Sequence, residues 1–248
     1  MIRTIVTTVC LFLLAMSVRA VEHLKLSTTT STDNSGLLAV LHPVFETKYD
    51  AKIDVIAVGT GKALKIGANG DVDVVFVHAP DAELKYVEQG DFIDRKAVMH
   101  NDFVIVGSQQ DPAKVAAASS ATDALQRIAK YKSDFVSRGD DSGTHKKEKA
   151  LWAKANIQPE SRWYIQAGQG MGAVLKIADK MSLKVLYEGD ETLFNPYHVM
   201  AVNPQKHAHV NYDLAKKYID FVTSKEGQTI INNFRKSDQQ LFYSDAVK

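Results

Sequence analysis

Short runs rich in β-branched residues alternate with stretches of helical periodicity, and this alternation constrains the fold more than any other feature of the sequence. Strands are predicted at 24–27, 52–58, 72–77, 103–106, 134–137, 163–166, 183–187 and 198–202. Helices are predicted at 36–49 with a kink at Pro43, and at 81–89, 122–131, 143–156, 172–179 and 212–234, the last split near Gly227. Strand-helix-strand alternation is typical of parallel sheets covered by helices on both faces. The sequence therefore predicts an α/β fold.

The first twenty residues differ from the rest of the chain. A basic start, Met1 to Arg3, precedes an apolar run from Thr4 to Met16, and Val18-Arg19-Ala20 places small residues at the positions of a signal-cleavage site. We interpret residues 1–20 as a secretory signal peptide. No later stretch approaches the roughly 20 apolar residues that a membrane helix needs, so we expect the mature protein to be exported and soluble.

Composition excludes several classes of protein. With 45% hydrophobic and 24% charged residues, the chain is neither disordered nor fibrous. Loss of the signal would remove Arg3 and Arg19 and no acidic residue, which changes the formal net charge from +1 to −1. A nearly neutral exported protein is a poor candidate for binding nucleic acid or an anionic membrane. The single cysteine, Cys10, lies within the signal, so neither a disulfide nor thiol chemistry is expected after cleavage.

Three predicted strand-to-helix turns are loaded with hydroxyl and amide donors. They are Ser27 to Ser35, Gly59-Thr60-Gly61, and Arg138 to His145. Ligands of open α/β sheets bind outside the carboxyl ends of the strands. A helix N-terminus there offers unpaired backbone donors and about half a positive charge, and glycine lets an anion approach the backbone. If the three turns converge, their target is a compact oxyanion.

Magnitudes indicate which donors would matter most. A hydrogen bond to a charged group contributes about 1.5–3 kcal/mol, so six such donors give roughly 9–18 kcal/mol gross. One arginine at about 4 Å adds about 4 kcal/mol per unit charge. Neutral donors should therefore dominate, with Arg138 supplying charge balance. Each turn alone is also explained by ordinary helix capping, but three consecutive threonines and the Arg138 turn exceed what capping requires.

Other chemistry is less well supported by the sequence. Ser142, His145 and Asp141 lie in one turn, which does not place a base on a nucleophile held by a third group. The eight histidines are scattered without a zinc motif. Gly59-Thr60-Gly61-Lys62 lacks the spacing of a P-loop, and Ala63 stands where Ser or Thr would be needed. We therefore expect no catalytic residue, no metal cation and no nucleotide.

The sequence resembles the periplasmic tungstate-binding proteins of ABC uptake systems, of the bacterial TupA type, over nearly the whole mature chain. The matching blocks, in the family's order, are 28–32 (Thr-Thr-Thr-Ser-Thr), 58–61, 78–80 (His-Ala-Pro), 101–107, 137–145, 167–172 and 194–197. The Arg-x-Asp-x-Ser-Gly-Thr spacing in the 137–145 block also resembles phosphate-binding relatives. The resemblance implies a type II periplasmic binding protein fold, with two lobes of mostly parallel sheet flanked by helices and the ligand in the interlobe cleft.

By motif position, the resemblance implies eight oxyanion contacts: Thr29, Thr30, Ser31, Thr60, Arg138, Ser142, Gly143 and Thr144. It implies a periplasmic, monomeric, non-enzymatic receptor without a cofactor, which delivers tungstate and also molybdate to an inner-membrane ABC permease. The first lobe is expected at 21–100 plus 206–248 and the second at 101–205. The alternatives are a phosphate or sulfate receptor of the same fold, or a secreted hydrolase using Ser142.

The chain departs from the family's pattern at one place. Relatives carry a further stretch with a Thr-Asp-Arg element before the strand that matches 183–187, whereas here Asp179-Lys180 runs almost directly into Met181-Ser182. We expect a second lobe that is smaller or locally disordered. Asp140 bears on selectivity, because a carboxylate on the ligand would accept the proton of hydrogenphosphate but repel a fully deprotonated oxyanion. Our hypothesis is that Asp140 turns away from the ligand and orients Arg138.

Overall fold

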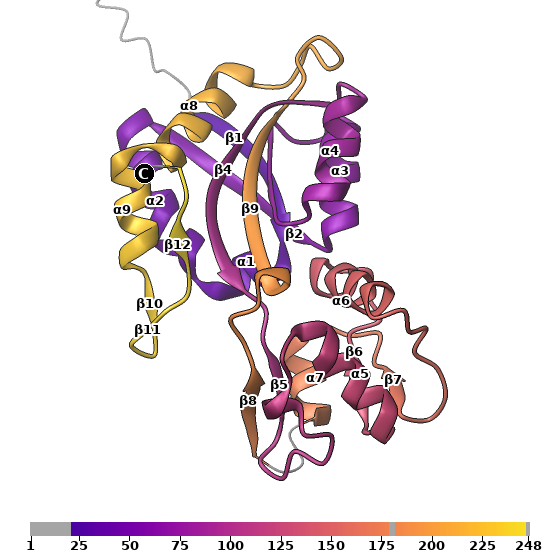
Figure 1. Cartoon of the computed structure of the whole chain (residues 1–248). Helices are drawn as coiled ribbons and strands as arrows, with labels where there is room; N and C mark the ends of the chain where they lie inside the picture. The colour runs from indigo at the N-terminus through magenta and orange to yellow at the C-terminus, as the bar shows by residue number, and fades with distance from the viewer. Residues whose placement is uncertain (1–20, 179–181, 247–248) are drawn as a thin grey trace, which may run out of the picture.

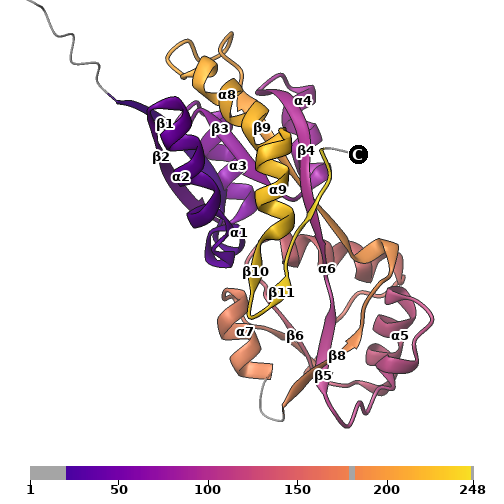
Figure 2. The same ribbon diagram turned by 90° about the vertical axis from the view of Figure 1, so that its left-hand side faces the viewer.

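The computed structural model describes residues 21–178 and 182–246. The chain forms two lobes, which are joined by two crossing segments that run side by side (Figures 1 and 2). One crossing segment leaves β4 (Phe92–Asp102) for the second lobe, and the other returns into β9 (Phe194–Val202). The expected signal peptide, residues 1–20, and the junction at 179–181 lie outside the described residues.

Lobe I is built on a six-stranded sheet in the order β12-β4-β9-β3-β1-β2. Its other strands are β1 (Glu22–Thr29), β2 (Ala51–Val58), β3 (Val74–Val77) and β12 (Tyr243–Ser244). β1 pairs in parallel with β2 and β3, whereas β9 is antiparallel to β3 and β4. The carboxyl ends of β1, β2 and β3 therefore lie at the same edge, toward the second lobe.

Helices cover both faces of this sheet (Figure 1). Because successive side chains of a strand point to opposite faces, Val74 and Phe76 of β3 join one core cluster while Val75 and Val77 join another. The first cluster includes side chains of α2 (Leu37–Tyr49), α8 (Tyr212–Thr223) and α9 (Lys225–Asn233), and the second those of α3 (Thr60–Ala68) and α4 (Pro80–Glu88). A short helix, α1 (Thr30–Ser35), follows β1, and a small hairpin joins β10 (Arg235–Lys236) to β11 (Gln239–Gln240).

Lobe II contains two separate two-stranded sheets among its described residues. β5 (Ile105–Ser108) and β8 (Leu183–Tyr187) are antiparallel, and β6 (Phe135–Ser137) and β7 (Tyr164–Gln166) are parallel. Its helices are η1 (Val115–Ala117), α5 (Ala121–Tyr131), α6 (Gly143–Lys154), α7 (Met171–Ala178) and η2 (Glu191–Leu193). One core cluster, which includes Trp152 and Leu125, contains side chains of all these elements except α7.

The structure confirms the two-lobed α/β class and corrects several details. The expected sheets were mostly parallel. The sheet of lobe I is mixed instead, because β9 is antiparallel to both of its neighbours, β3 and β4. The predicted range 101–205 put 194–202 in the second lobe, but β9 hydrogen-bonds within the sheet of lobe I. β4 was absent from the predicted strands. Among the described residues, no helix is long and apolar enough to cross a membrane.

The C-terminal helical stretch divides at Ser224, three residues before the predicted position. Ser224 Oγ accepts a hydrogen bond from the Gly227 amide and so caps α9. Gly227 does not end the first helix. It lets α9 pack closely against the end of α8, because a Cβ at this position would lie 2.3 Å from the Phe221 carbonyl oxygen. The two helices therefore cross closely over the sheet.

Candidate anion-binding site between the lobes

The end of β1 uses part of its hydroxyl run for structure. Ser27 Oγ donates to the Ala63 carbonyl at 3.1 Å, and Thr28 Oγ1 donates to the Phe76 carbonyl at 2.6 Å. Thr29 is the N-cap of α1, and its Oγ1 accepts from the Thr32 amide at 3.1 Å. These three side chains are buried. They fix the turn so that the exposed residues that follow, Thr30 and Ser31, lie at the edge facing lobe II.

Thr60 is the clearest sign of a binding function. It is the first residue of α3, directly after the N-cap Gly59, and only 1% of it is exposed. Its Oγ1 is one of three buried side-chain atoms in the described part of the chain without a hydrogen-bond partner. A buried hydroxyl in that condition costs about 1–3 kcal/mol. An oxyanion accepting from Thr60 would remove this cost.

The turn after β6 is held by its own side chains. Ser137 Oγ donates to Glu148 Oε2 at 2.6 Å and accepts from the Gly139 amide at 3.2 Å. Gly139 has a φ of +61°, a backbone conformation that favours glycine. Ser142 is the N-cap of α6, since its Oγ accepts from the His145 amide at 3.2 Å. The first backbone amides of α6 therefore face lobe I in a defined position.

Arg138 is buried at the lobe interface and is oriented by Asp140. Its Nε and Nη2 donate to Asp140 Oδ2 at 3.1 and 2.5 Å, and its Nη1 lies 3.5 Å from Ser31 Oγ in the other lobe. Partial burial alone would raise the pKa of Asp140, but hydrogen bonds from Ser142 and Arg138 hold that pKa below its usual value. The hypothesised contact of Asp140 with Arg138 is present, so the guanidinium is fixed by a carboxylate that stays ionised.

The starts of α3 and α6 meet face to face. A Cβ added at Gly143 would lie 3.2 Å from Thr60 Oγ1 and 2.6 Å from His78 Cε1, and one added at Gly61 would lie 3.1 Å from Asp141 Oδ2. All eight residues predicted as contacts thus lie on three turns that converge between the lobes, with Thr144 half-buried beside Gly143. Their roles as ligand contacts stay a prediction.

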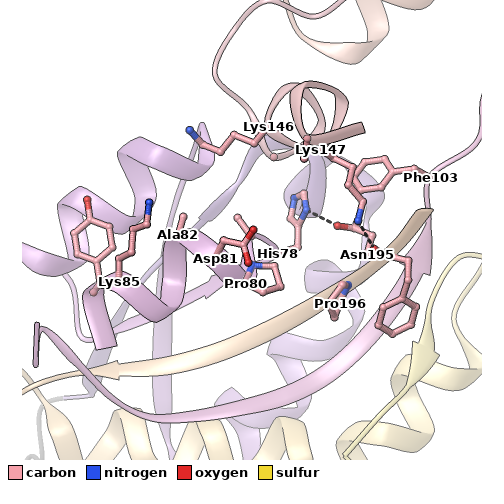
Figure 3. Close-up of a pocket in the computed structure, with 15 residues that line it drawn as sticks. His78, Pro80, Asp81, Ala82, Lys85, Phe103, Lys146, Lys147, Asn195 and Pro196 are labelled. Atoms are coloured by element: carbon pink, nitrogen blue, oxygen red, sulfur yellow. Dashed lines mark hydrogen bonds between the residues drawn. The ribbon is translucent and has the colours of Figure 1, made fainter. Parts of the chain in front are cut away.

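Residues near this site that the sequence did not assign a role are His78, Asn101 and Asn195. They are buried or half-buried where β3 ends and the crossing segments pass. Beside them lies a cavity of about 440 Å³, which His78, Asp81, Lys85, Phe103, Lys147 and Asn195 help to line (Figure 3). Of the predicted contacts only Gly143 lines it, whereas Thr29, Thr60 and Arg138 do not. The cavity is therefore a neighbour of the convergent turns, not the space between them.

Ser142 has no general base in His145. Its Oγ accepts a hydrogen bond from the backbone amide of His145, while His145 Nδ1 accepts one from the Asp141 amide. The imidazole therefore does not take the hydroxyl proton, as a triad would require. In the described parts of the chain no cluster of three or more His, Cys, Asp or Glu residues is arranged to hold a metal ion.

Comparisons with known proteins agree with this geometry. A PBP superfamily domain matches residues 19–226. The chain is 42% identical to the tungstate-binding protein TupA of Peptoclostridium acidaminophilum, across 90% of this chain and 86% of that protein. Two solved structures are similar. The tungstate ABC transporter from Geobacter sulfurreducens has 52% identity, a TM-score of 0.78 and 86% and 99% coverage of the two chains. TupA from Desulfovibrio alaskensis G20 has 40% identity, a TM-score of 0.80 and 90% and 99% coverage.

The match to the Peptoclostridium protein also indicates a difference in length. It extends over 245 positions but includes only 90% of the 248 residues of this chain, so that protein carries about 20 residues without a counterpart here. The sequence predicts a missing stretch at 179–182, and this position stays a prediction. Most of that junction lies outside the described residues, and α7 and β8 flank it in lobe II.

Proposed function

The chain belongs to the TupA-type tungstate-binding family within the PBP superfamily, and we propose that it captures tungstate in the interlobe cleft and delivers it to an ABC permease. The observation that carries the proposal is the buried hydroxyl of Thr60, which lacks a protein partner and faces the turn of the opposite lobe. The proposed contacts are the eight residues named from the sequence.

The chemistry of the turns favours a fully deprotonated oxyanion. Both oxygens of Asp140 are engaged, Oδ1 by the Ser142 amide and Oδ2 by Arg138. Its lowered pKa keeps the carboxylate ionised. Because both oxygens already accept hydrogen bonds within the turn, the side chain has less acceptor capacity left for the proton that hydrogenphosphate carries at neutral pH. Hydroxyl and backbone donors suit every oxygen of a tetrahedral dianion, and molybdate, which has nearly the same size and charge, is the second expected ligand.

The remaining parts of the proposal follow from the family and the sequence. The basic and apolar start of the chain supports export to the periplasm. Membership of the family supports a permease partner and capture by lobe closure about the crossing segments. We propose a monomeric receptor that acts on its ligand without chemical change, needs no cofactor and is not an enzyme. The hydrogen bonds of His145 leave it without the role of a base toward Ser142.

Isothermal titration calorimetry of the mature protein against tungstate, molybdate, sulfate and phosphate tests the proposal. Tungstate and molybdate should bind much more tightly than the other two anions. Arg138→Ala should weaken tungstate binding about 100-fold, because it removes a charge worth several kcal/mol at contact distance and leaves Asp140 uncompensated. Arg127→Ala is the matched control, since Arg127 pairs with Asp123 within one turn of α5, away from the cleft.

Two results would contradict the proposal. Tighter binding of phosphate or sulfate than of tungstate would make the chain a receptor for that anion. Equal tungstate affinity in Arg138→Ala and Arg127→Ala would remove the convergent turns as the site.

A further inference from the structure

His78 lies between the turn after β1, the start of α6 in lobe II and the crossing segments. It follows the last residue of β3 and is buried. Its ring stacks on Tyr197 of β9, with centroids 4.6 Å apart and planes inclined by 29°. Figure 3 shows the ring beside Asn195, on the crossing segment that returns from lobe II. The proposed ligand contacts do not include this residue.

The hydrogen bonds of His78 run in one direction. Asn195 Nδ2 donates to Asn101 Oδ1 at 2.7 Å, which leaves Asn195 Oδ1 to accept from His78 Nδ1 at 3.0 Å. Burial lowers the pKa of His78, so the ring is neutral and carries its proton on Nδ1. His78 Nε2 is then an acceptor, and it lies 3.4 Å from Thr29 Oγ1, the cap of α1. The ring connects both crossing segments with a turn of the anion site.

The His78 ring also lies directly against lobe II. Gly143, the first residue of α6, approaches so closely that a Cβ there would lie 2.6 Å from His78 Cε1 and 3.1 Å from Nδ1. A contact below 3.0 Å is not tolerated by ring atoms held on both sides. Asn195 and Tyr197, both on β9, hold the ring in lobe I.

We propose that His78 is a positioning residue that sets how far the lobes close and couples the crossing segments to the oxyanion site; the inference rests on the proposed function. Asn195 and Tyr197 hold the ring in one orientation, and Thr29 and Gly143 meet it from the two lobes. When the ring is in place, the amides of α6 stop at hydrogen-bonding distance from an anion held by lobe I. The closed form persists, and the anion leaves slowly.

Stopped-flow kinetics of tungstate binding and release tests this role with His78→Gln, which replaces the ring by an amide side chain of similar length. Release should become about tenfold faster, the equivalent of one lost buried hydrogen bond, while the association rate stays within about twofold. His42→Gln is the matched control. His42 is a second buried histidine of lobe I, bonded to Tyr218 at 3.0 Å away from the cleft, and its variant should lose thermal stability without faster release.

A pair of variants tests the same role by a different route. Gly143→Ala should abolish or strongly weaken tungstate binding, because its methyl group meets the ring before closure is complete. Adding His78→Ala should restore part of the affinity, although each change alone weakens it. This pair decides the question if His78→Gln fails to fold.

The outcomes separate the inference from the proposed function. Failure of the unmodified protein to bind tungstate would overturn both. Tight binding by the unmodified protein, together with equal release rates in His78→Gln and His42→Gln, would overturn the role of His78 alone. Absence of recovery in the double variant would also overturn it.

Discussion

The two lobes support their share of the anion site in different ways. In lobe I, Thr29 and Thr60 follow strands of a six-stranded sheet with apolar packing on both faces. In lobe II the described strands form two separate pairs, and the Arg138 turn is held by polar side chains. Glu148 accepts from both Ser137 and Tyr164, and Asp140 holds the guanidinium. A turn can thus be positioned by a large core or by a local hydrogen-bond network.

Lobe II also leaves more apolar surface uncovered beside its strands. Large apolar side chains at least one-third exposed in lobe II include Val104, Val106, Tyr131, Ile165, Met171, Leu175, Ile177 and Val185. Because stability depends on buried apolar area, we expect lobe I to provide most of the free energy of unfolding and lobe II to unfold first.

Core truncation in each lobe gives the largest effect and can break this comparison. Phe45→Ala removes a fully buried ring of lobe I and should cost about 3–5 kcal/mol of global stability. Leu125→Ala removes a buried side chain of lobe II and should accelerate amide hydrogen exchange mainly in that lobe. Urea unfolding combined with hydrogen-exchange mass spectrometry measures both. Equal acceleration in both lobes by Leu125→Ala would show that they unfold as one unit.

Acid should weaken lobe I through His42. Burial lowers the pKa of His42 to about 4 from 6.5, partly offset by the nearby Glu46 carboxylate. Between these values the unfolded chain binds a proton that the native ring does not, so the free energy of unfolding decreases as pH falls from about 6.5 to about 4 and then levels off. This group contributes a loss of about 3 kcal/mol.

Urea unfolding of the unmodified protein and of His42→Gln across this pH range measures the loss. The glutamine variant does not titrate, so the stability difference between the two proteins should shrink as pH falls. A constant difference would mean that His42 is not the responsible group. Lobe II has no buried histidine among its described residues, and its hydrogen exchange should change less.

The same contrast between lobes explains how much the sequence predicts. Periodicity located many of the longer elements of both lobes, because β-branched runs and caps are local signals, and the three donor-rich turns do converge. β4 was not predicted, since Asp94, Arg95 and Lys96 interrupt its apolar pattern. Arg95 is accommodated by the buried carboxylate of Glu83, twelve residues away, with donor–acceptor distances of 2.9 and 3.0 Å. Such compensation depends on tertiary contact.

Residues whose role depends on distant partners were also not predictable. His78 belongs to a recognised motif, but its function depends on Asn195, which is 117 positions away. The Ser142 hydroxyl is predicted to bind the ligand, and in the structure it also caps α6 by accepting from the His145 amide. Sequence spacing indicates which residues can cap a helix. It does not indicate which hydroxyl is left without a partner, and only the arrangement of both lobes distinguishes Thr60 from Ser142.

Thr60→Val tests the lobe I hydroxyl, with a smaller expected effect. Valine has almost the same shape but no hydroxyl, so tungstate affinity should fall by about 1.5–3 kcal/mol, the contribution of one hydrogen bond to a charged group. Stability of the ligand-free protein should be unchanged or slightly higher, because the hydroxyl lacks a partner there. Calorimetry and thermal unfolding measure the two quantities. A large loss of ligand-free stability would show that Thr60 serves the fold.

Ser142→Ala is the counterpart in lobe II and should have the smallest effect. Its hydroxyl caps α6 by accepting from the His145 amide at 3.2 Å, so its removal should cost about 1 kcal/mol of stability in the ligand-free protein. The loss should appear as faster hydrogen exchange in the first turn of α6, and tungstate affinity should fall less than in Thr60→Val. Ser142→Gly is the control, because glycine is a tolerated N-cap and should recover most of the lost stability. If Ser142→Ala instead weakens binding as much as Thr60→Val while leaving α6 protected, the hydroxyl turns to the ligand on closure. The two lobes would then hold the anion in the same way.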